Sequence, residues 1–110
     1  MSKDFMLGKN WKDIEHSNED GLKFEDNVLE YIYSITKRNQ KTFPDLWNIV
    51  KDFYGDSKTL PEKLPHLIKE VEIFIEKNKT PEIFNESFID LVNLCKKGIN
   101  KRLTLYGIAD

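Results

Sequence analysis

The clearest hydrophobic pattern in the chain lies between Leu60 and Lys77, where apolar residues recur every three or four positions. This spacing places them on one face of an α-helix that packs against a core. The stripe consists of Leu64, Leu67, Ile68, Val71, Phe74 and Ile75. Pro65 lacks an N–H and crowds the turn before it, so a single helix starting at Leu60 would be broken there. We expect one turn at 60–63, a bend, and a main helix over 65–77.

Ile73 does not fit this stripe, because helical geometry places it on the opposite side. Its neighbours on that side are Lys69, Glu70 and Lys77. A buried Ile73 would make this a central helix that is contacted on two sides. An exposed Ile73 would make the helix an alternative docking surface.

Three other segments show the same helical spacing. They are Phe24–Lys37, Phe43–Tyr54 and a segment from Pro81 to about Lys101. Candidate N-cap residues precede three of the four expected helices, and these are Thr42, Thr59 and Thr80. Thr59 also has capping-box spacing to Glu62.

The two ends of the chain lack helical spacing. Residues 1–23 predict a mostly irregular, acidic segment. Trp11 either anchors this segment to the core or is an exposed contact residue for a partner. Residues 103–108 alternate and favour extended structure, so they either pair as a short strand with Phe5–Leu7 or pack without pairing. We predict an all-α, four-helix bundle-like single domain over residues 1–110, with a short terminal β-strand pair as an open alternative.

The composition suits one soluble globular domain. The chain has 110 residues, of which 39% are hydrophobic and 33% charged, and its net charge of −2 does not favour a nucleic-acid binder. No stretch approaches the ~20 apolar residues that span a bilayer, and the N-terminus lacks the apolar run of a signal peptide. One cysteine excludes an internal disulfide. We expect a cytoplasmic protein that contacts neither membrane nor nucleic acid directly.

Residues that could carry chemistry are few. Cys95 sits within an apolar helical stripe, and neither His16 nor His66 has a partner at metal-binding spacing. Asp52 and Asp56 flank a glycine, but capping explains them better than a cation site. The five glycines are scattered and form no phosphate loop. We therefore expect no enzymatic activity, no metal and no cofactor.

Negative charge is concentrated in one region. Between Asp13 and Glu30 the chain carries seven acids and one base, a net charge of −6. One interpretation is a solvated acidic face, and the other is a docking surface for a basic partner, with aromatic anchors. The docking interpretation predicts the partner-binding residues Asp13, Glu15, Glu19, Asp20, Asp26, Glu30 and Tyr33.

Positive charge gathers near the C-terminal end of the last expected helix, at Lys96, Lys97, Lys101 and Arg102. Bases at a helix C-terminus complement the helix dipole, which explains this cluster better than phosphate binding does.

Four features in this order resemble the small bacterial immunity proteins of contact-dependent growth inhibition and other polymorphic toxin systems. They are the string LGKNW at Leu7–Trp11, the acidic segment, FYGD at Phe53–Asp56, and LTLYGIAD at Leu103–Asp110. The resemblance implies a non-enzymatic inhibitor that binds one toxin domain and occludes its active site. Toxins of this kind are often nucleases with basic clefts, which an acidic surface would match.

The expected function is therefore that of an immunity protein whose partner is a cognate toxin domain. Two alternatives remain open. One is a non-enzymatic helical adaptor or regulatory protein that binds another protein. The other is a helical domain that binds a small molecule, which would need an apolar cavity between its helices.

Overall fold

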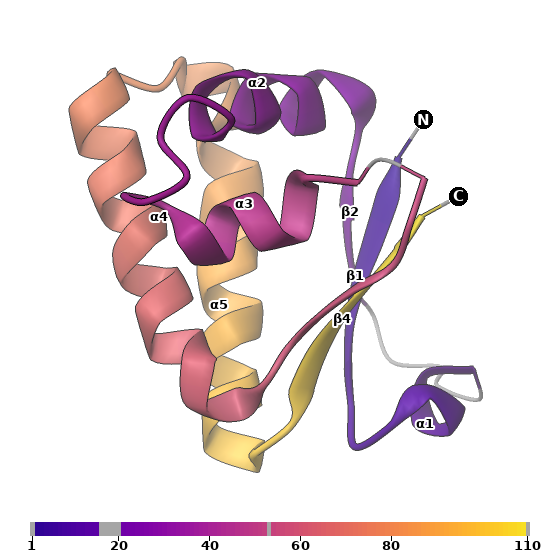
Figure 1. Cartoon of the computed structure of the whole chain (residues 1–110). Coiled ribbons are helices and arrows are strands. Elements are labelled where there is room, and N and C mark those ends of the chain that lie inside the picture. The colour runs from indigo at the N-terminus through magenta and orange to yellow at the C-terminus, as the bar shows by residue number, and fades with distance from the viewer. Residues whose placement is uncertain (1, 16–20, 53, 110) are drawn as a thin grey trace.

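A four-stranded antiparallel sheet lies beside a group of helices in the computed structural model, which describes residues 2–15, 21–52 and 54–109 (Figure 1). The strand order is β2-β1-β4-β3, so the strands nearest the two chain ends form its centre. The strands are β1 (Lys3–Gly8), β2 (Leu22–Phe24), β3 (Ser57–Thr59) and β4 (Thr104–Ala109). The fold class is therefore mixed α/β.

The predicted all-α class is wrong, because the termini build a sheet rather than extensions of a bundle. The strand pair left open by the sequence is present: β1 and β4 pair over six residues, from Lys3 opposite Ala109 to Gly8 opposite Thr104. The edge strands β2 and β3 have three residues each. Strands this short carry too little alternation to be recognised from sequence.

The expectation of a mostly irregular N-terminal segment is also wrong. Residues 3–8 form β1, residues 11–15 form the short helix α1 (Trp11–Glu15), and β2 follows. Trp11 does contact the sheet, since its ring centroid lies 4.4 Å from that of Tyr106 in β4. It nevertheless stays 42% exposed, so it anchors α1 without entering the core.

The four helices expected from hydrophobic spacing are present. They are α2 (Asp26–Thr36), α3 (Pro44–Val50), α4 (Leu64–Asn78) and α5 (Asn85–Lys101). The separate turn predicted at 60–63 is confirmed as a 3-10 turn, η1 (Pro61–Lys63), and a second one, η2 (Glu82–Phe84), precedes α5. The helix predicted to reach Tyr54 ends at Val50 instead.

None of the three expected threonine caps forms. The N-cap positions are Phe43, Leu60 and Pro81, one residue after each threonine, and none has a side-chain capping bond. The hydroxyls of Thr59 and Thr80 are buried without a hydrogen-bond partner. Local sequence therefore located these helix starts, but it did not identify the groups that accept hydrogen bonds from their first N–H groups.

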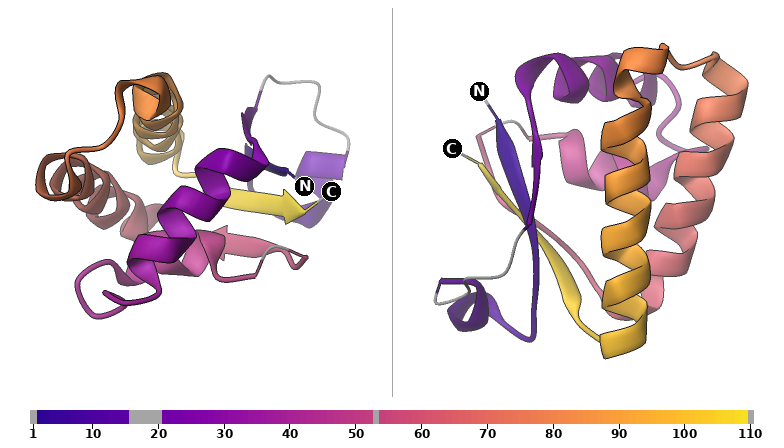
Figure 2. Two further views of the ribbon diagram at one scale, coloured as in Figure 1. Left: turned by 90° about the horizontal axis from the view of Figure 1, so that it is seen from above. Right: turned by 180° about the vertical axis from the view of Figure 1, so that it is seen from behind.

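Helices α2 to α5 gather on one side of the sheet, and α1 lies on the other (Figure 2). The central helix α4 buries Leu64, Leu67, Val71 and Phe74, as its stripe predicted. The Phe74 ring lies 5.4 Å from Phe43 and 5.6 Å from Phe88, centroid to centroid, so it joins α3 and α5 at the core. Ile73 is 40% exposed, which leaves the outer face of α4 open as an alternative docking surface.

The sheet is tightly packed at Gly107, which lies in β4 opposite Phe5 of β1 and Ser57 of β3. A Cβ atom at this position would lie 2.5 Å from Ser57 Oγ and 2.8 Å from Phe5 Cε1. The side chains of Ser57 and Phe5, on the two neighbouring strands, would have to move to admit it. We expect Gly107→Ala to lower the free energy of unfolding by about 1–3 kcal/mol, measured by urea denaturation. A free energy of unfolding equal to that of the wild type would contradict this packing.

Candidate protein interface

The short helix α3 is fixed at its N-terminus by an acid from another helix. The first N–H groups of a helix have no partner within it, and Pro44 at the first position has no N–H to satisfy. The Glu70 side chain of α4 accepts hydrogen bonds at Oε1 from the backbone N–H of Asp45 (3.0 Å) and of Leu46 (3.1 Å). Glu70 thus does what a local cap residue would otherwise do.

This contact buries Glu70, which the helical pattern had placed on the solvent side of α4. The residue is 9% exposed, because it faces α3 rather than water. Burial raises the pKa of Glu70 to about 7, and the neighbouring carboxylate of Asp45 acts in the same direction. The N–H groups of Leu46 and Asp45 act against this rise, because they stabilise the carboxylate.

The other end of α3 is held by a buried base. Lys3 of β1 is 1% exposed, and its Nζ donates to the carbonyl oxygens of Ile49 (3.0 Å) and Asp52 (3.4 Å). Burial lowers the pKa of Lys3, while the carboxylates of Asp52 and Asp56 act in the opposite direction. The acid at the N-terminus and the base at the C-terminus both complement the helix dipole.

The helix held in this way presents a tryptophan at the surface. Trp47 is half-buried and packs against Tyr33 of α2, with ring centroids 5.4 Å apart and an angle of 35° between the rings. Lys37 Nζ lies 5.7 Å from the Tyr33 ring centroid, within the range of a cation–π contact. The aromatic pair is therefore supported on both helices and still partly accessible.

Two acids lie on the same side of α2 as Tyr33. Asp26, Glu30 and Tyr33 follow each other at spacings of four and three residues, so they form one stripe along the helix. Asp26 and Glu30 are exposed. We call the surface made by Asp26, Glu30, Tyr33 and Trp47 the α2–α3 face.

Asp13, another predicted partner-binding residue, does not join this face. Asp13 is exposed on α1, and its Oδ2 accepts the backbone N–H of Lys9 at 2.9 Å. Helix α2 lies at the top of the molecule and α1 at the bottom, both in Figure 1 and in the view from behind in Figure 2. The side chain of Glu15 and the whole of Glu19 and Asp20 lie outside the described residues.

The sequence did not identify Trp47 as a binding residue. Its spacing relative to Phe43, Leu46 and Val50 is that of the buried face of a helix. The sequence signal that could have identified Trp47 as a binding residue is the residue type, because tryptophan and tyrosine are enriched at the energetic centres of interfaces.

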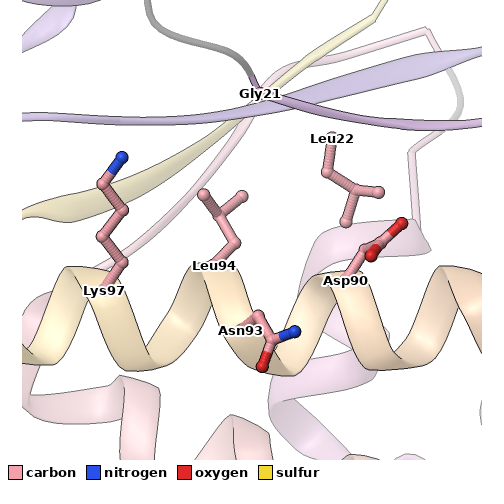
Figure 3. Close-up of a pocket in the computed structure, with 6 residues that line it drawn as sticks. All are labelled: Gly21, Leu22, Asp90, Asn93, Leu94 and Lys97. Atoms are coloured by element: carbon pink, nitrogen blue, oxygen red, sulfur yellow. The ribbon is translucent and has the colours of Figure 1, made fainter.

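A surface groove of about 370 Å³ lies between the edge strand β2 and helix α5 (Figure 3). The residues that line it are Gly21, Leu22, Asp90, Asn93, Leu94 and Lys97. Asp90, Leu94 and Lys97 extend from α5 toward the strand, and Leu22 points back toward the helix. The centre of the groove is apolar, with a negative charge toward one end and a positive charge toward the other.

The residues that the sequence singled out for possible chemistry are Cys95, His16 and His66. Cys95 is fully buried in the core, as its apolar stripe predicted, and burial raises the pKa of its thiol to about 12. Within residues 2–15, 21–52 and 54–109, no three or more His, Cys, Asp or Glu side chains are placed to hold a metal ion. His66 is exposed, and His16 lies outside the described residues.

Comparisons with known proteins give no match: no family model fits the sequence, and no curated protein or solved structure is similar to it at a significant level. None of the helices in the described ranges combines the length and apolar character needed to cross a bilayer. The function is therefore argued from the α2–α3 face.

The raised pKa of Glu70 predicts how stability depends on pH. The value rises from 4.5 to about 7 on folding, so between these pH values the folded state binds more protons than the unfolded state. The free energy of unfolding should therefore fall as the pH rises through this window, by about 1–3 kcal/mol. Glu70→Gln should remove this decrease, measured by urea denaturation at several pH values.

A matched control is Glu76→Gln, since Glu76 is an exposed acid of the same helix. This variant should keep the wild-type slope of stability against pH. A Glu70→Gln protein with the same slope as the wild type would show that Glu70 does not titrate in this range.

Proposed function

We propose that this protein is an immunity-type inhibitor, which binds a toxin domain with a basic surface through the α2–α3 face. The inhibitor acts by occupying the toxin's active site and performs no reaction itself. Its place of action is the cytoplasm, where a single buried cysteine would stay reduced. The partner that fits best is a nuclease, because its cleft must be positively charged to bind phosphates.

The observation that carries the proposal is the accessible Tyr33–Trp47 pair beside the exposed acids Asp26 and Glu30. Interfaces draw most of their binding energy from a few aromatic or arginine anchors near the centre. Charged residues around such anchors accelerate association and select the partner by charge. The α2–α3 face combines both features on two adjacent helices.

The anchoring of α3 also favours binding. A side chain that is already held in place loses less conformational entropy when it is buried in an interface. Trp47 sits on a helix that Glu70 and Lys3 hold at its two ends, and its ring rests on Tyr33. The aromatic pair is therefore organised before a partner arrives.

In the proposed complex, the carboxylates of Asp26 and Glu30 face lysine or arginine side chains of the toxin, in the place of substrate phosphates. The rings of Tyr33 and Trp47 fill an adjacent apolar recess. Together they exclude the nucleic-acid substrate from the cleft.

The test starts from the genes that neighbour the gene for this chain, and a neighbour that encodes a toxin domain is the candidate partner. The full-length protein should protect cells that express the toxin and should bind it in a purified system. Trp47→Ala should weaken binding about 30-fold or more, equivalent to about 2 kcal/mol, mainly through faster dissociation. Asp26→Lys combined with Glu30→Lys should slow association and reduce its dependence on salt.

The control for the charge change is Glu72→Lys combined with Glu76→Lys, on the exposed side of α4. It changes the net charge equally but leaves the α2–α3 face intact, so binding should remain close to that of the wild type. If this control weakens binding as much as the α2 variant does, the partner docks elsewhere, and the exposed Ile73 side of α4 becomes the better candidate.

A further inference from the structure

Helix α5 carries an exposed stripe in which charge changes sign along the helix. The spacing of its members places them on one side, where all of them are exposed: Glu86, Asp90, Asn93, Lys97 and Lys101. The two acids occupy the N-terminal half and the two bases the C-terminal half. We call this set the α5 stripe.

The α5 stripe is complementary to itself. Glu86 and Lys101 lie equally far from the midpoint of the stripe, between Asn93 and Leu94, and so do Asp90 and Lys97. If two α5 helices run antiparallel about a twofold axis through this midpoint, every acid faces a base of the other copy. A twofold interface uses the same patch on both subunits, so each pair forms twice.

We propose that a second copy of this chain docks on the α5 stripe, antiparallel and about a twofold axis near Asn93. The two ion pairs of the interface are Glu86 with Lys101 of the other copy, and Asp90 with Lys97 of the other copy. Lys97 also has an interaction within its own chain, and its side chain remains exposed.

The charge pattern favours a second copy over a different partner. A strongly basic partner would be attracted to Glu86 and Asp90 but repelled by Lys97 and Lys101, and an acidic partner would meet the reverse. A surface with the same two acids and two bases, oriented in the opposite direction, places an opposite charge against all four residues. A second copy of this chain has such a surface. Like charges placed opposite each other cost interaction energy, which gives the pairing its direction.

The groove beside α5 gives this contact an apolar centre. Leu22 of β2 and Leu94 of α5 are half-buried there, and both line the groove (Figure 3). In the antiparallel arrangement, side chains from the middle of the second α5 lie over these two leucines. Asp90 and Lys97 then lie on either side of the apolar centre.

The contact leaves the α2–α3 face free. Helix α5 lies behind α3 in Figure 1 and in front when the molecule is seen from behind in Figure 2. A dimer built on the α5 stripe therefore presents two α2–α3 faces to solvent. Exposed ion pairs add little stability and are screened by salt, so the dimer should be weak and sensitive to ionic strength.

Sedimentation velocity of the full-length protein at low ionic strength tests the proposal. With increasing concentration, the mass should rise from the 13.0 kDa of one chain toward twice that value, and salt should reverse the change. A basic variant, Glu86→Lys with Asp90→Lys, should stay monomeric. An acidic variant, Lys97→Glu with Lys101→Glu, should also stay monomeric. An equimolar mixture of the two should form a heterodimer, because every facing pair is again of opposite charge.

The matched control is Glu72→Lys with Glu76→Lys on α4, which changes the net charge as the basic variant does but should dimerise like the wild type. A wild-type protein that stays monomeric at all concentrations overturns the proposal. The proposal is also overturned if the basic variant still dimerises, or if the mixture of the two variants does not associate.

A second measurement avoids charge reversal, in case a variant fails to fold. Asn93→Cys places a thiol near the proposed twofold axis, and mild oxidation should give a disulfide-linked dimer at low salt but far less in high salt. Glu76→Cys on α4 should give none. Equal cross-linking of the two variants would overturn the proposed axis.

Discussion

The interaction on which the rest of the structure depends is the anchoring of α3 between a buried acid and a buried base. A helix of seven residues is not stable alone, because so few hydrogen bonds do not repay the cost of nucleation. Glu70 satisfies its first N–H groups and Lys3 two carbonyl oxygens at its other end. Since Glu70 belongs to α4 and Lys3 to β1, the same two contacts connect the helices to the sheet.

The anchoring of α3 also determines where the main aromatic residue of the proposed interface lies. Trp47 is the one aromatic residue of α3, and it reaches the surface beside Tyr33. Its position depends on groups that never contact a partner. The acids of α2 add charge on the same side, whereas α5 offers a separate, self-complementary surface at the back of the molecule. The two proposed binding sites, one for a partner and one for a second copy, therefore do not overlap.

Sequence alone was sufficient to locate helices α2 to α5, but it missed α1 and was insufficient for the sheet. The stripe of α4 spans enough turns for its spacing to be unambiguous, and the bend before Pro65 follows from proline geometry. The edge strands are too short to show an alternation of apolar and polar residues. In β1 the first buried position is the charged residue Lys3, which makes the buried face harder to recognise. At α3 the expected Thr42 cap is replaced by a tertiary contact, because Glu70 reaches the start of this helix from 25 residues away. Of the predicted site, Asp26, Glu30 and Tyr33 share one face, while the role of Trp47 depends on how α3 packs against α2.

Native-state hydrogen exchange of α3 tests the central claim most directly. The Lys51 amide donates to the Trp47 carbonyl oxygen at 2.8 Å and reports on the last turn of the helix. If both ends of α3 are fixed as described, this amide should exchange only through global unfolding, with an opening free energy equal to that of the core amides of α4 and α5. Exchange through a local opening of much lower free energy, independent of denaturant, would contradict the account, because α3 would then detach while the rest of the protein stays folded.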